Sequence, residues 1–320
     1  MKAIVYREYG GPERLALEEV TRPSPGAQEV LVQVAAVALN ASDTEFLAGC
    51  PLYARIRGLS RPRRQVLGSD LAGRVVAVGD RVTRFRAGDA VMCDVLEHGG
   101  GLAEFALAPE DRLVAKPEGL SFEEAAAVPQ SGVLALEALL YGGGPAGEKL
   151  LINGAGGGAG TFALQLARHL GAAKVTAVDR PQKHALMRSL GADEVIDHTA
   201  VDFARCARRY DRIIDLVASR STLACARALE RGGVYLLVGG SVRRLLEFLS
   251  LGPLVSIAGA RRLRVLAYRK DRGELEQVAQ LCASGAIRPI IQRSYPLRDA
   301  AEAFRELRAG CVSGKVVVTL

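Results

Sequence analysis

A glycine-rich stretch is the first candidate for binding chemistry. Residues 151–162 read LINGAGGGAGTF, with five glycines among twelve residues. An apolar, strand-like run ends at Asn153, and a helix-like run begins near Thr161. Glycines at such a junction let the backbone approach a phosphate, whose charge is attracted by the unpaired N–H groups of the helix N-terminus. The alternative is a flexible loop that binds no ligand.

The spacing of the small residues favours the phosphate site. Ala155, Gly157 and Gly160 fit the G-x-G-x-x-G fingerprint, with Ala in place of the first glycine. Asp179 follows Gly160 by 19 residues (179 − 160) and ends the next apolar run, as an acidic ribose-binding residue does. We therefore predict a dinucleotide site formed by Ala155, Gly156, Gly157, Gly158, Ala159 and Gly160.

The residues around Asp179 favour different cofactors. Its carboxylate would accept hydrogen bonds from the adenosine ribose and repel a 2′-phosphate, which favours NADH. Arg180 and Lys183 would pair with that phosphate, which favours NADPH, although both also suit a solvated turn. The sequence predicts NAD(P)H as cofactor, with a lean toward NADH.

Strand-like and helix-like runs alternate around this loop. A capping box of Ser121 and Glu124 predicts a helix start. Apolar strands follow at 150–153, 175–178, 194–196, 212–217 and 233–238, and helical patterns lie at 160–170, 181–190, 199–208 and 220–230. This alternation predicts a parallel sheet covered by helices on both faces.

The two ends of the chain have a different pattern. The first ~120 residues contain short alternating strands separated by Gly, Pro and Asp, as in β-rich domains. Residues 272–284 and 298–309 are helix-like, and 315–320 form a last strand. We therefore predict an α/β protein. Residues 1–124 and 269–320 form a discontinuous β-rich domain, and residues 125–268 form an inserted, doubly wound dinucleotide-binding domain.

Composition excludes several classes of protein. The 320 residues are 49% hydrophobic and 24% charged, which is typical of a globular chain. The net charge of +7 comes from scattered arginines without interleaved aromatics, so we expect no nucleic-acid partner. The longest apolar stretch, 245–260, contains Glu247, Gly252 and Pro253, so we expect no stable membrane insertion. The six cysteines form no CxxC pair and the N-terminus lacks a long apolar region, which favours a reduced, cytoplasmic protein.

Seven motifs, one of them the glycine-rich stretch, occur in a characteristic order along nearly the whole chain. They are LNASDTEFLAG (39–49), LGSDLAGRVVAVG (67–79), FRAGDAV (85–91), AAAVPQSGVLAL (125–136), INGAGGGAGTFALQLA (152–167), LGADEVID (190–197) and GKVVVTL (314–320). In this order they resemble the medium-chain dehydrogenase/reductase superfamily, in its zinc-independent quinone oxidoreductase-like branch. The resemblance implies a GroES-like catalytic domain, an inserted Rossmann domain, a substrate cleft between them and a homodimer.

The resemblance also bears on metal binding. The zinc alcohol dehydrogenases have a Cys where this chain has Asn40, and a His-Glu pair where it has Ser69-Asp70. A catalytic zinc needs about three protein ligands of Cys, His or carboxylate type. The four-Cys lobe of a structural zinc is also missing, so we expect no metal site.

Without a metal, a developing alkoxide has no Lewis acid to stabilise it. Hydride transfer to the C=C of a quinone, enone or enoyl compound is easier, because the charge spreads onto a conjugated carbonyl. We expect a small, apolar, conjugated substrate. The alternatives are a zinc-free alcohol or carbonyl oxidoreductase, and a dinucleotide-binding interaction protein with a degenerate active site.

The resemblance implies roles for several further residues. Asn40 would donate a hydrogen bond to the enolate oxygen, or it would instead cap the helix that contains Asp43. Some enoyl reductases of this superfamily have a Tyr just after the glycine that matches Gly49. Tyr53 is displaced from that position, but it is a candidate proton donor; the alternative is a packing or lid Tyr, with reprotonation by solvent. Gln130, Gly239 and Gly240 would lie on the nicotinamide side. Residues 241–268 suit a hydrophobic lid or a dimer surface, and less well an interfacial helix.

Overall fold

The structure is a computed structural model that describes residues 1–56, 58–206, 209–259 and 261–320. It contains two compact units. The first comprises Met1–Val133 with Lys270–Leu320, and the second comprises Leu134–Arg269. Helix α3 (Pro129–Leu140) crosses the first boundary between the units without interruption.

A mainly antiparallel sheet of seven strands forms the centre of the first unit. Its order is β14-β15-β3-β4-β5-β7, and β6 pairs with β3. The strands are β3 (Glu29–Ala38), β4 (Asp70–Val78), β5 (Ala90–Asp94), β6 (Phe105–Pro109), β7 (Val114–Ala115), β14 (Ile291–Pro296) and β15 (Lys315–Thr319). The C-terminal strand β15 lies antiparallel beside β3. The last residues of the chain therefore complete a sheet that the first 115 residues begin.

The remaining elements of this unit surround the sheet. β1 (Lys2–Val5) and β2 (Ala16–Glu19) form a separate antiparallel pair. The helices are α1 (Ala41–Ala48), α2 (Phe122–Ala127), α8 (Arg272–Ala283) and α9 (Ala300–Arg308), with 3-10 turns η1 (Pro12–Arg14), η2 (Leu52–Arg55), η3 (Glu110–Arg112) and η6 (Leu297–Asp299). At the start of α2 the Ser121 hydroxyl accepts from the Glu124 N–H at 3.1 Å, and the Ser121 N–H donates to the Glu124 carboxylate at 2.8 Å. The predicted capping box is confirmed.

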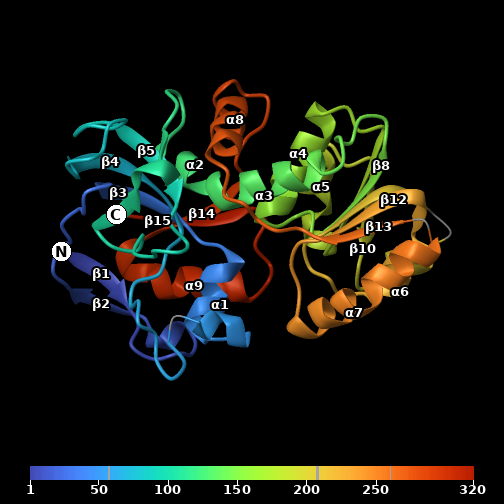
Figure 1. Ribbon diagram of the computed structural model, residues 1–320, viewed down its shortest axis with the longest axis horizontal. Coiled ribbons are helices and arrows are strands. Elements are labelled where there is room, and N and C mark those ends of the chain that lie inside the picture. Colours follow the sequence, from blue (N-terminus) through green and yellow to red (C-terminus); the bar gives the residue numbers. More distant parts are fainter. Residues whose placement is uncertain (57, 207–208, 260) are drawn as a thin grey trace. The chain divides into compact units, whose positions relative to one another are not determined.

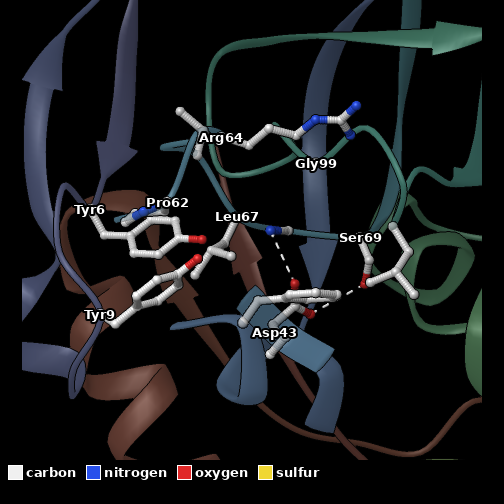
Figure 2. Close-up of a pocket in the computed structure, with 13 residues that line it drawn as sticks. Tyr6, Tyr9, Asp43, Pro62, Arg64, Leu67, Ser69 and Gly99 are labelled. Carbon is white, nitrogen blue, oxygen red and sulfur yellow. Dashed lines mark hydrogen bonds between the residues drawn. The ribbon is translucent and has the colours of Figure 1, made fainter. Parts of the chain in front are cut away.

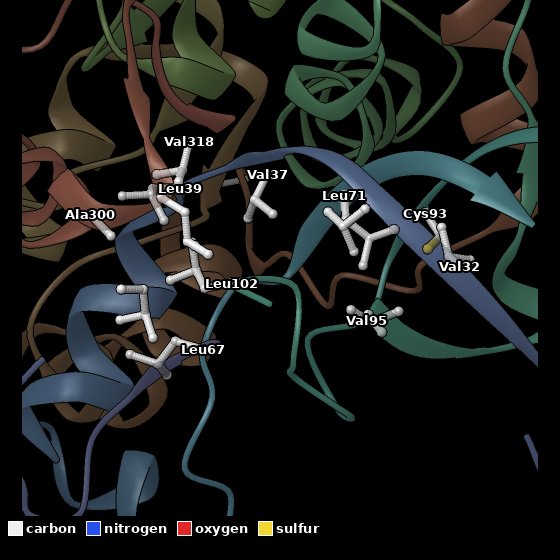
Figure 3. Packing of buried hydrophobic residues seen from close by; sticks show 14 of the residues in the cluster. Val32, Val37, Leu39, Leu67, Leu71, Cys93, Val95, Leu102, Ala300 and Val318 are labelled. Carbon is white, nitrogen blue, oxygen red and sulfur yellow. The ribbon is translucent and has the colours of Figure 1, made fainter. Parts of the chain in front are cut away.

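Buried hydrophobic side chains from neighbouring strands form the core of this unit. Figure 3 shows Val32 of β3, Leu71 of β4 and Cys93 of β5 among them, with Val318 contributed by β15. Each of these four side chains is inaccessible to solvent. Any polar group at this level of the sheet is therefore withdrawn from water and needs a partner within the protein.

The second unit contains a six-stranded parallel sheet with the order β10-β9-β8-β11-β12-β13. The strands are β8 (Lys149–Asn153), β9 (Lys174–Asp179), β10 (Glu194–Asp197), β11 (Tyr210–Asp215), β12 (Leu229–Leu237) and β13 (Arg262–Val265). The connections run outward in both directions from β8 and β11, which is the doubly wound order 3-2-1-4-5-6. Such a sheet binds ligands in the crevice where the direction reverses, beyond the carboxyl ends of its strands.

Helices cover both faces of this sheet. They are α4 (Gly158–His169), α5 (His184–Ser189), α6 (Thr222–Arg227) and α7 (Val242–Gly259), with 3-10 turns η4 (Pro181–Lys183) and η5 (Phe203–Arg205). Right-handed crossovers that leave in opposite directions place α4 and α5 on one face and α6 and α7 on the other, as Figure 1 shows. The predicted doubly wound, helix-covered sheet is confirmed.

One predicted helix is largely absent. Within 199–206 the chain forms only the 3-10 turn η5, and residues 207–208 lie outside the described residues. Asp202 explains the difference, because its carboxylate accepts from the Ala204 N–H at 3.1 Å and from Arg220 Nε at 2.8 Å. A short polar side chain that bonds the nearby backbone favours a turn over a helix.

Two structural facts bear on the composition. All six cysteines are free thiols. In the part of the chain that the structure describes, no helix combines the length and the apolar character needed to cross a bilayer.

Candidate active site

The glycine-rich loop lies between β8 and α4, as predicted. The strand ends at Asn153, Gly154 turns the chain with a φ of +85°, and Gly157 is the N-cap of α4. The first N–H groups of a helix have no partner within it. The Gly157 N–H already donates to the Gly154 carbonyl at 3.1 Å. Gly158 and Ala159, the first two residues of α4, are partly exposed, so their N–H groups are the donors that face a ligand.

The two fingerprint glycines face different surroundings. A Cβ at Gly160 would lie 2.2 Å from the Gly154 carbonyl oxygen, so the helix and the turn pack too closely for any side chain. A Cβ at Gly157 would meet only the Gly154 oxygen, at an ordinary 3.5 Å, and the backbone φ there is −86°. Nothing in the protein therefore requires a glycine at 157. An open space above a helix N-terminus fits a pyrophosphate, and this loop suits the predicted dinucleotide.

The side chain of Asp179 is already bonded within the protein. At the end of β9 it accepts from the Gly156 N–H at 2.9 Å and from the Arg180 N–H at 2.8 Å. Lys183 Nζ lies 3.5 Å from its carboxylate, and both side chains are almost fully buried. A Cβ at Gly156 would lie 2.5 Å from Lys183 Cδ, so the lysine stem covers the loop. The negative charge of Asp179, which was expected to exclude a 2′-phosphate, is therefore partly compensated by the Lys183 ammonium.

Gly239 and Gly240 follow β12 and pass the end of β11. A Cβ at Gly239 would lie 2.5 Å from the Leu216 carbonyl oxygen. Gly240 has a φ of +128°, and its Cβ would lie 2.4 Å from that of Ala218. Both positions need glycine because the two segments pass so closely, whatever else they contact.

Asn40 lies in the first unit at the N-cap of α1, but its side chain does not cap the helix. Asn40 Nδ2 donates to Asp70 Oδ2 at 2.8 Å and to Ser69 Oγ at 3.1 Å. Its Oδ1 accepts from the Lys315 ammonium and, at 3.4 Å, from Ser131 Oγ. The capping group is instead the Asp43 carboxylate, which accepts from the Asn40 N–H at 2.9 Å. The amide of Asn40 is thus bonded on both sides and fixed in orientation.

Lys315 completes this cluster, and sequence reasoning did not identify it. It opens β15, is 2% exposed and places Nζ 3.6 Å from Asp70 Oδ2 and 3.2 Å from Ser131 Oγ. Burial lowers the pKa of Lys315, and burial raises the pKa of Asp70 to about 8 against the pull of the ammonium. The sequence shows a lysine at the start of an otherwise apolar strand, but this pattern does not indicate which residues the lysine would contact.

Two polar residues extend the cluster toward α3. The Gln130 N–H donates to both Asp70 oxygens, at 3.2 and 3.1 Å, and the Gln130 side-chain oxygen accepts from Ser42 Oγ at 3.2 Å. Gln130 was predicted as a nicotinamide contact. In the structure its backbone N–H is hydrogen-bonded to Asp70 and its side-chain oxygen to Ser42. A contact with the nicotinamide stays a prediction.

Asp43 connects the cluster to a small cavity in the first unit. Its carboxylate accepts from the Gly68 N–H at 3.1 Å and from Ser69 Oγ at 3.2 Å, as Figure 2 shows. Burial raises the pKa of Asp43 to about 6, opposed by these hydrogen bonds and by Lys315. The cavity, of about 20 Å³, has room for one water molecule. Asp43, Ser69, Tyr6, Tyr9 and Arg64 are among its lining residues.

Tyr53, the candidate acid, lies in η2 and is 52% exposed. Its hydroxyl donates to the Glu45 carboxylate. Partial burial and this neighbouring carboxylate raise the pKa of Tyr53, and burial raises that of Glu45. In this arrangement the phenol holds its proton more tightly than a free tyrosine does.

The residues around Asn40 do not suit a zinc ion. An amide, a hydroxyl and one carboxylate face an ammonium, and the Asp70 oxygens already accept hydrogen bonds. Zinc prefers thiolate, imidazole and carboxylate ligands, and a lysine cation at 3.6 Å would repel it. Among the described residues, no group of three or more His, Cys, Asp or Glu side chains has the arrangement of a metal site.

Comparison with known proteins identifies the family. Residues 26–118 match the model of the alcohol dehydrogenase GroES-like domain, and residues 190–318 match that of the zinc-binding dehydrogenases. The chain is 32% identical to the NADPH-dependent alkenal/one oxidoreductase of Arabidopsis thaliana, over 99% of this chain and 79% of that protein. It is 31% identical to the quinone oxidoreductase of Mus musculus, over 100% and 98%.

The fold agrees with these sequence matches. The structure superposes on that of Escherichia coli quinone oxidoreductase complexed with NADPH with a TM-score of 0.87 and 26% identity. This superposition covers 100% of both chains. The protein therefore belongs to the medium-chain dehydrogenase/reductase superfamily, in its quinone oxidoreductase-like branch.

Proposed function

We propose that the protein is an NAD(P)H-dependent oxidoreductase that reduces the activated C=C of a quinone, enone or enoyl compound without zinc. The observation that carries this proposal is the group of side chains around Asn40. An ammonium, an amide and a hydroxyl lie where a metal would need anionic or imidazole ligands. A site without a Lewis acid favours substrates that spread the incoming negative charge over a conjugated carbonyl.

The cofactor would bind at the glycine-rich loop. Bound NAD(P)H supplies the hydride, and the protein orients it. The N–H groups of Gly158 and Ala159 would hold the pyrophosphate at the N-terminus of α4, and Gly157, which has no side chain, would let it approach.

Asp179, Arg180 and Lys183 would decide between NADH and NADPH. Because Lys183 partly compensates Asp179, the lean toward NADH is weaker than the sequence indicates. We propose that both cofactors bind and that the balance between Asp179 and Lys183 sets the preference.

Asn40 is the proposed hydrogen-bond donor to the oxygen that gains negative charge. Its 3.1 Å bond to Ser69 is longer than its 2.8 Å bond to Asp70, so the proton facing Ser69 is the one that a substrate oxygen would capture. Lys315 and Ser131 hold the Oδ1 side, which keeps the NH₂ group facing outward from the lysine.

Either Tyr53 or solvent would supply the proton to carbon. Tyr53 as the acid would have to give up its bond to Glu45, and its raised pKa opposes this transfer. Tyr53→Phe separates the two sources. A general acid contributes roughly 10²- to 10⁴-fold to the rate, so a much smaller loss of kcat assigns the proton to solvent.

The remaining proposals concern organisation. We propose that the catalytic domain comprises residues 1–124 and 269–320, with the dinucleotide-binding domain, 125–268, between them. The compact units differ from these bounds in that the first extends to Val133 and resumes at Lys270. We also propose a homodimer and a cytoplasmic location, the latter supported by six free thiols.

The experiment that tests this function is a substrate panel. Oxidation of NADH and NADPH would be followed with a quinone, an enone, an enoyl thioester and a saturated aldehyde, with and without a chelator. We expect turnover of the first three types of compound, unaffected by the chelator. Turnover of the aldehyde alone, or activity that the chelator abolishes, would contradict the proposal.

A further inference from the structure

A basic loop borders the cavity beside Asp43. We use this name for the described residues 51–56 and 58–64 of the segment PLYARIRGLSRPRR, which contain four arginines. No Asp or Glu occurs between Glu45 and Asp70. The sequence around the loop therefore carries an uncompensated positive charge, although the net charge of the whole chain is only +7.

The loop also exposes large aliphatic side chains. Leu52, Ile56 and Leu59 are 76%, 84% and 78% exposed, respectively. Single exposed leucines are common on protein surfaces, but three large aliphatic side chains exposed within eight residues call for an explanation.

These side chains are exposed although their backbone is fastened to the unit. Ala54 and Pro62 are buried, and the Tyr9 hydroxyl donates to the Gly58 carbonyl at 2.6 Å. Arg55 stacks over the Tyr9 ring at 4.9 Å and donates to the Gly49 carbonyl at 2.9 Å. Because the loop is anchored at these points, turning the aliphatic side chains inward would break existing contacts.

Three arginines near the end of the loop are available to bind a partner. Arg61, Arg63 and Arg64 are exposed, and no ion pair joins them to a carboxylate of the described residues. Unpaired guanidinium groups beside aliphatic side chains match the interface of a bilayer that contains anionic phospholipid. The aliphatic groups enter the acyl boundary, and the arginines bind phosphates.

We propose that the basic loop docks the protein reversibly on anionic phospholipid membranes. Other partners fit the loop less well. A symmetric contact with a second copy would bring like-charged loops together. Single-stranded nucleic acid is bound by stacking on aromatic rings, and Tyr53 is the only aromatic residue of the loop.

Docking at this place would bring the candidate active site close to the bilayer. Ala54, Pro62 and Arg64 line the same cavity as Asp43 and Ser69, as Figure 2 shows for the last four of these residues. Asp43 and Ser69 are in turn hydrogen-bonded to Asn40. This consequence rests on the proposed function, because apolar quinones and enones concentrate in membranes. Lipid binding itself does not depend on that function.

The test is flotation of the full-length protein with vesicles. We would compare phosphatidylcholine vesicles with vesicles that also contain phosphatidylserine. The basic variant is Arg61→Gln/Arg63→Gln/Arg64→Gln, and the aliphatic variant is Leu52→Ser/Ile56→Ser/Leu59→Ser. The matched control, Arg188→Gln/Arg227→Gln/Arg298→Gln, removes the same charge from exposed positions elsewhere. Circular dichroism and thermal melting check that each variant folds.

We expect the wild type to float with the anionic vesicles and not with the neutral ones. Each arginine near the surface changes partitioning about fivefold, so the basic variant should lose on the order of 100-fold. The aliphatic variant should lose at least about tenfold, and the control should bind like the wild type.

Four results would overturn the proposal. Three of them are that the wild type does not bind anionic vesicles, that the control loses as much vesicle binding as the basic variant, and that the aliphatic variant binds like the wild type. The fourth result is that the aliphatic variant dissociates an oligomer that forms without vesicles, which would assign the patch to a second copy. Activity toward soluble enones is measured in parallel, so a failure of docking is distinguished from a failure of the proposed reaction.

Discussion

Lys315 Nζ lies 3.6 Å from the Asp70 carboxylate, and both side chains are buried. Lys315 opens β15 and Asp70 opens β4, and these strands lie on either side of β3. Asn40 follows β3 and bonds both residues. The pair therefore bridges the strand that leads to the candidate catalytic amide, and it fixes which side of that amide faces the lysine.

Removing the lysine should destabilise the first unit. Removing one partner of a buried ion pair costs about 3–5 kcal/mol of stability. Because the pKa of Asp70 is raised, its carboxylate can take up a proton when the lysine is gone, so we expect a cost at the lower end of this range. We expect Lys315→Met to lower the free energy of unfolding by about 3 kcal/mol, measured by urea denaturation with circular dichroism. The control is Lys315→Met/Asp70→Asn, which should lose less than the single variant. An equal or larger loss in the double variant would mean that the two charges are not coupled.

Asp43 should make stability depend on pH. Its pKa is raised from 3.8 to about 6 on folding, so the native state keeps a proton that the unfolded chain releases. This contribution is present at low pH and is lost as the pH rises through about 6. The change corresponds to about 3 kcal/mol.

The measurement for Asp43 is the pH dependence of unfolding in the wild type and in Asp43→Asn. The variant loses stability at every pH because its amide cannot accept all the hydrogen bonds of the carboxylate. Its curve should nevertheless be flatter than that of the wild type between pH 4 and pH 6, the window set by the two pKa values. Parallel curves for the two proteins would show that Asp43 does not titrate in this range.

The glycine-rich loop offers a paired test of the cofactor site. Gly157→Val should fold, because its Cβ has space and its backbone φ is −86°, but it should bind NAD(P)H at least about 100-fold more weakly because the side chain fills the phosphate space. Gly160→Ala should instead lower the melting temperature, since its Cβ would lie 2.2 Å from a carbonyl oxygen. Calorimetry and thermal melting measure the two effects. Unchanged affinity in a folded Gly157→Val protein would place the phosphate elsewhere.

Substitutions at Asp179 and Lys183 should shift the cofactor preference in opposite directions. Asp179→Ser removes a negative charge and frees Lys183 for a 2′-phosphate, which favours NADPH. Lys183→Gln leaves Asp179 less compensated, which favours NADH. Each change should alter the ratio of kcat/KM for the two cofactors by about tenfold. Shifts in the same direction would show that the two side chains do not act as a pair.

The position of the glycine-rich loop between β8 and α4 was predictable because its signals are local. A strand end, the spacing of small residues and an acidic residue at the next strand end all lie within about thirty residues. The structure adds that Gly160 is required by packing whereas Gly157 is not, a distinction that spacing alone does not contain. The hydrogen bond from the Gly156 N–H to Asp179 and the ion pair of Asp179 with Lys183 depend on the conformation of the loop, so the sequence did not predict them.

The cluster around Asn40 was only partly predictable. Asn40 was recognised by resemblance, but its main partner Lys315 is 275 residues away in the chain. Pairing at such a distance depends on sheet topology, and the short pattern GKVVVTL predicts only a strand. Of the helix predicted at 199–208, the described residues 199–206 form only the 3-10 turn η5. The reason is local, because Asp202 bonds the nearby backbone and favours a turn.

The position of the transferred hydride tests the proposed reaction most directly. The protein would be incubated with NADH or NADPH deuterated at the transferable position and with an α,β-unsaturated ketone, in the presence of a chelator. The account predicts a saturated ketone with deuterium on the β-carbon, detected by NMR and mass spectrometry. An allylic alcohol with deuterium on the carbinol carbon would instead show carbonyl reduction and contradict it.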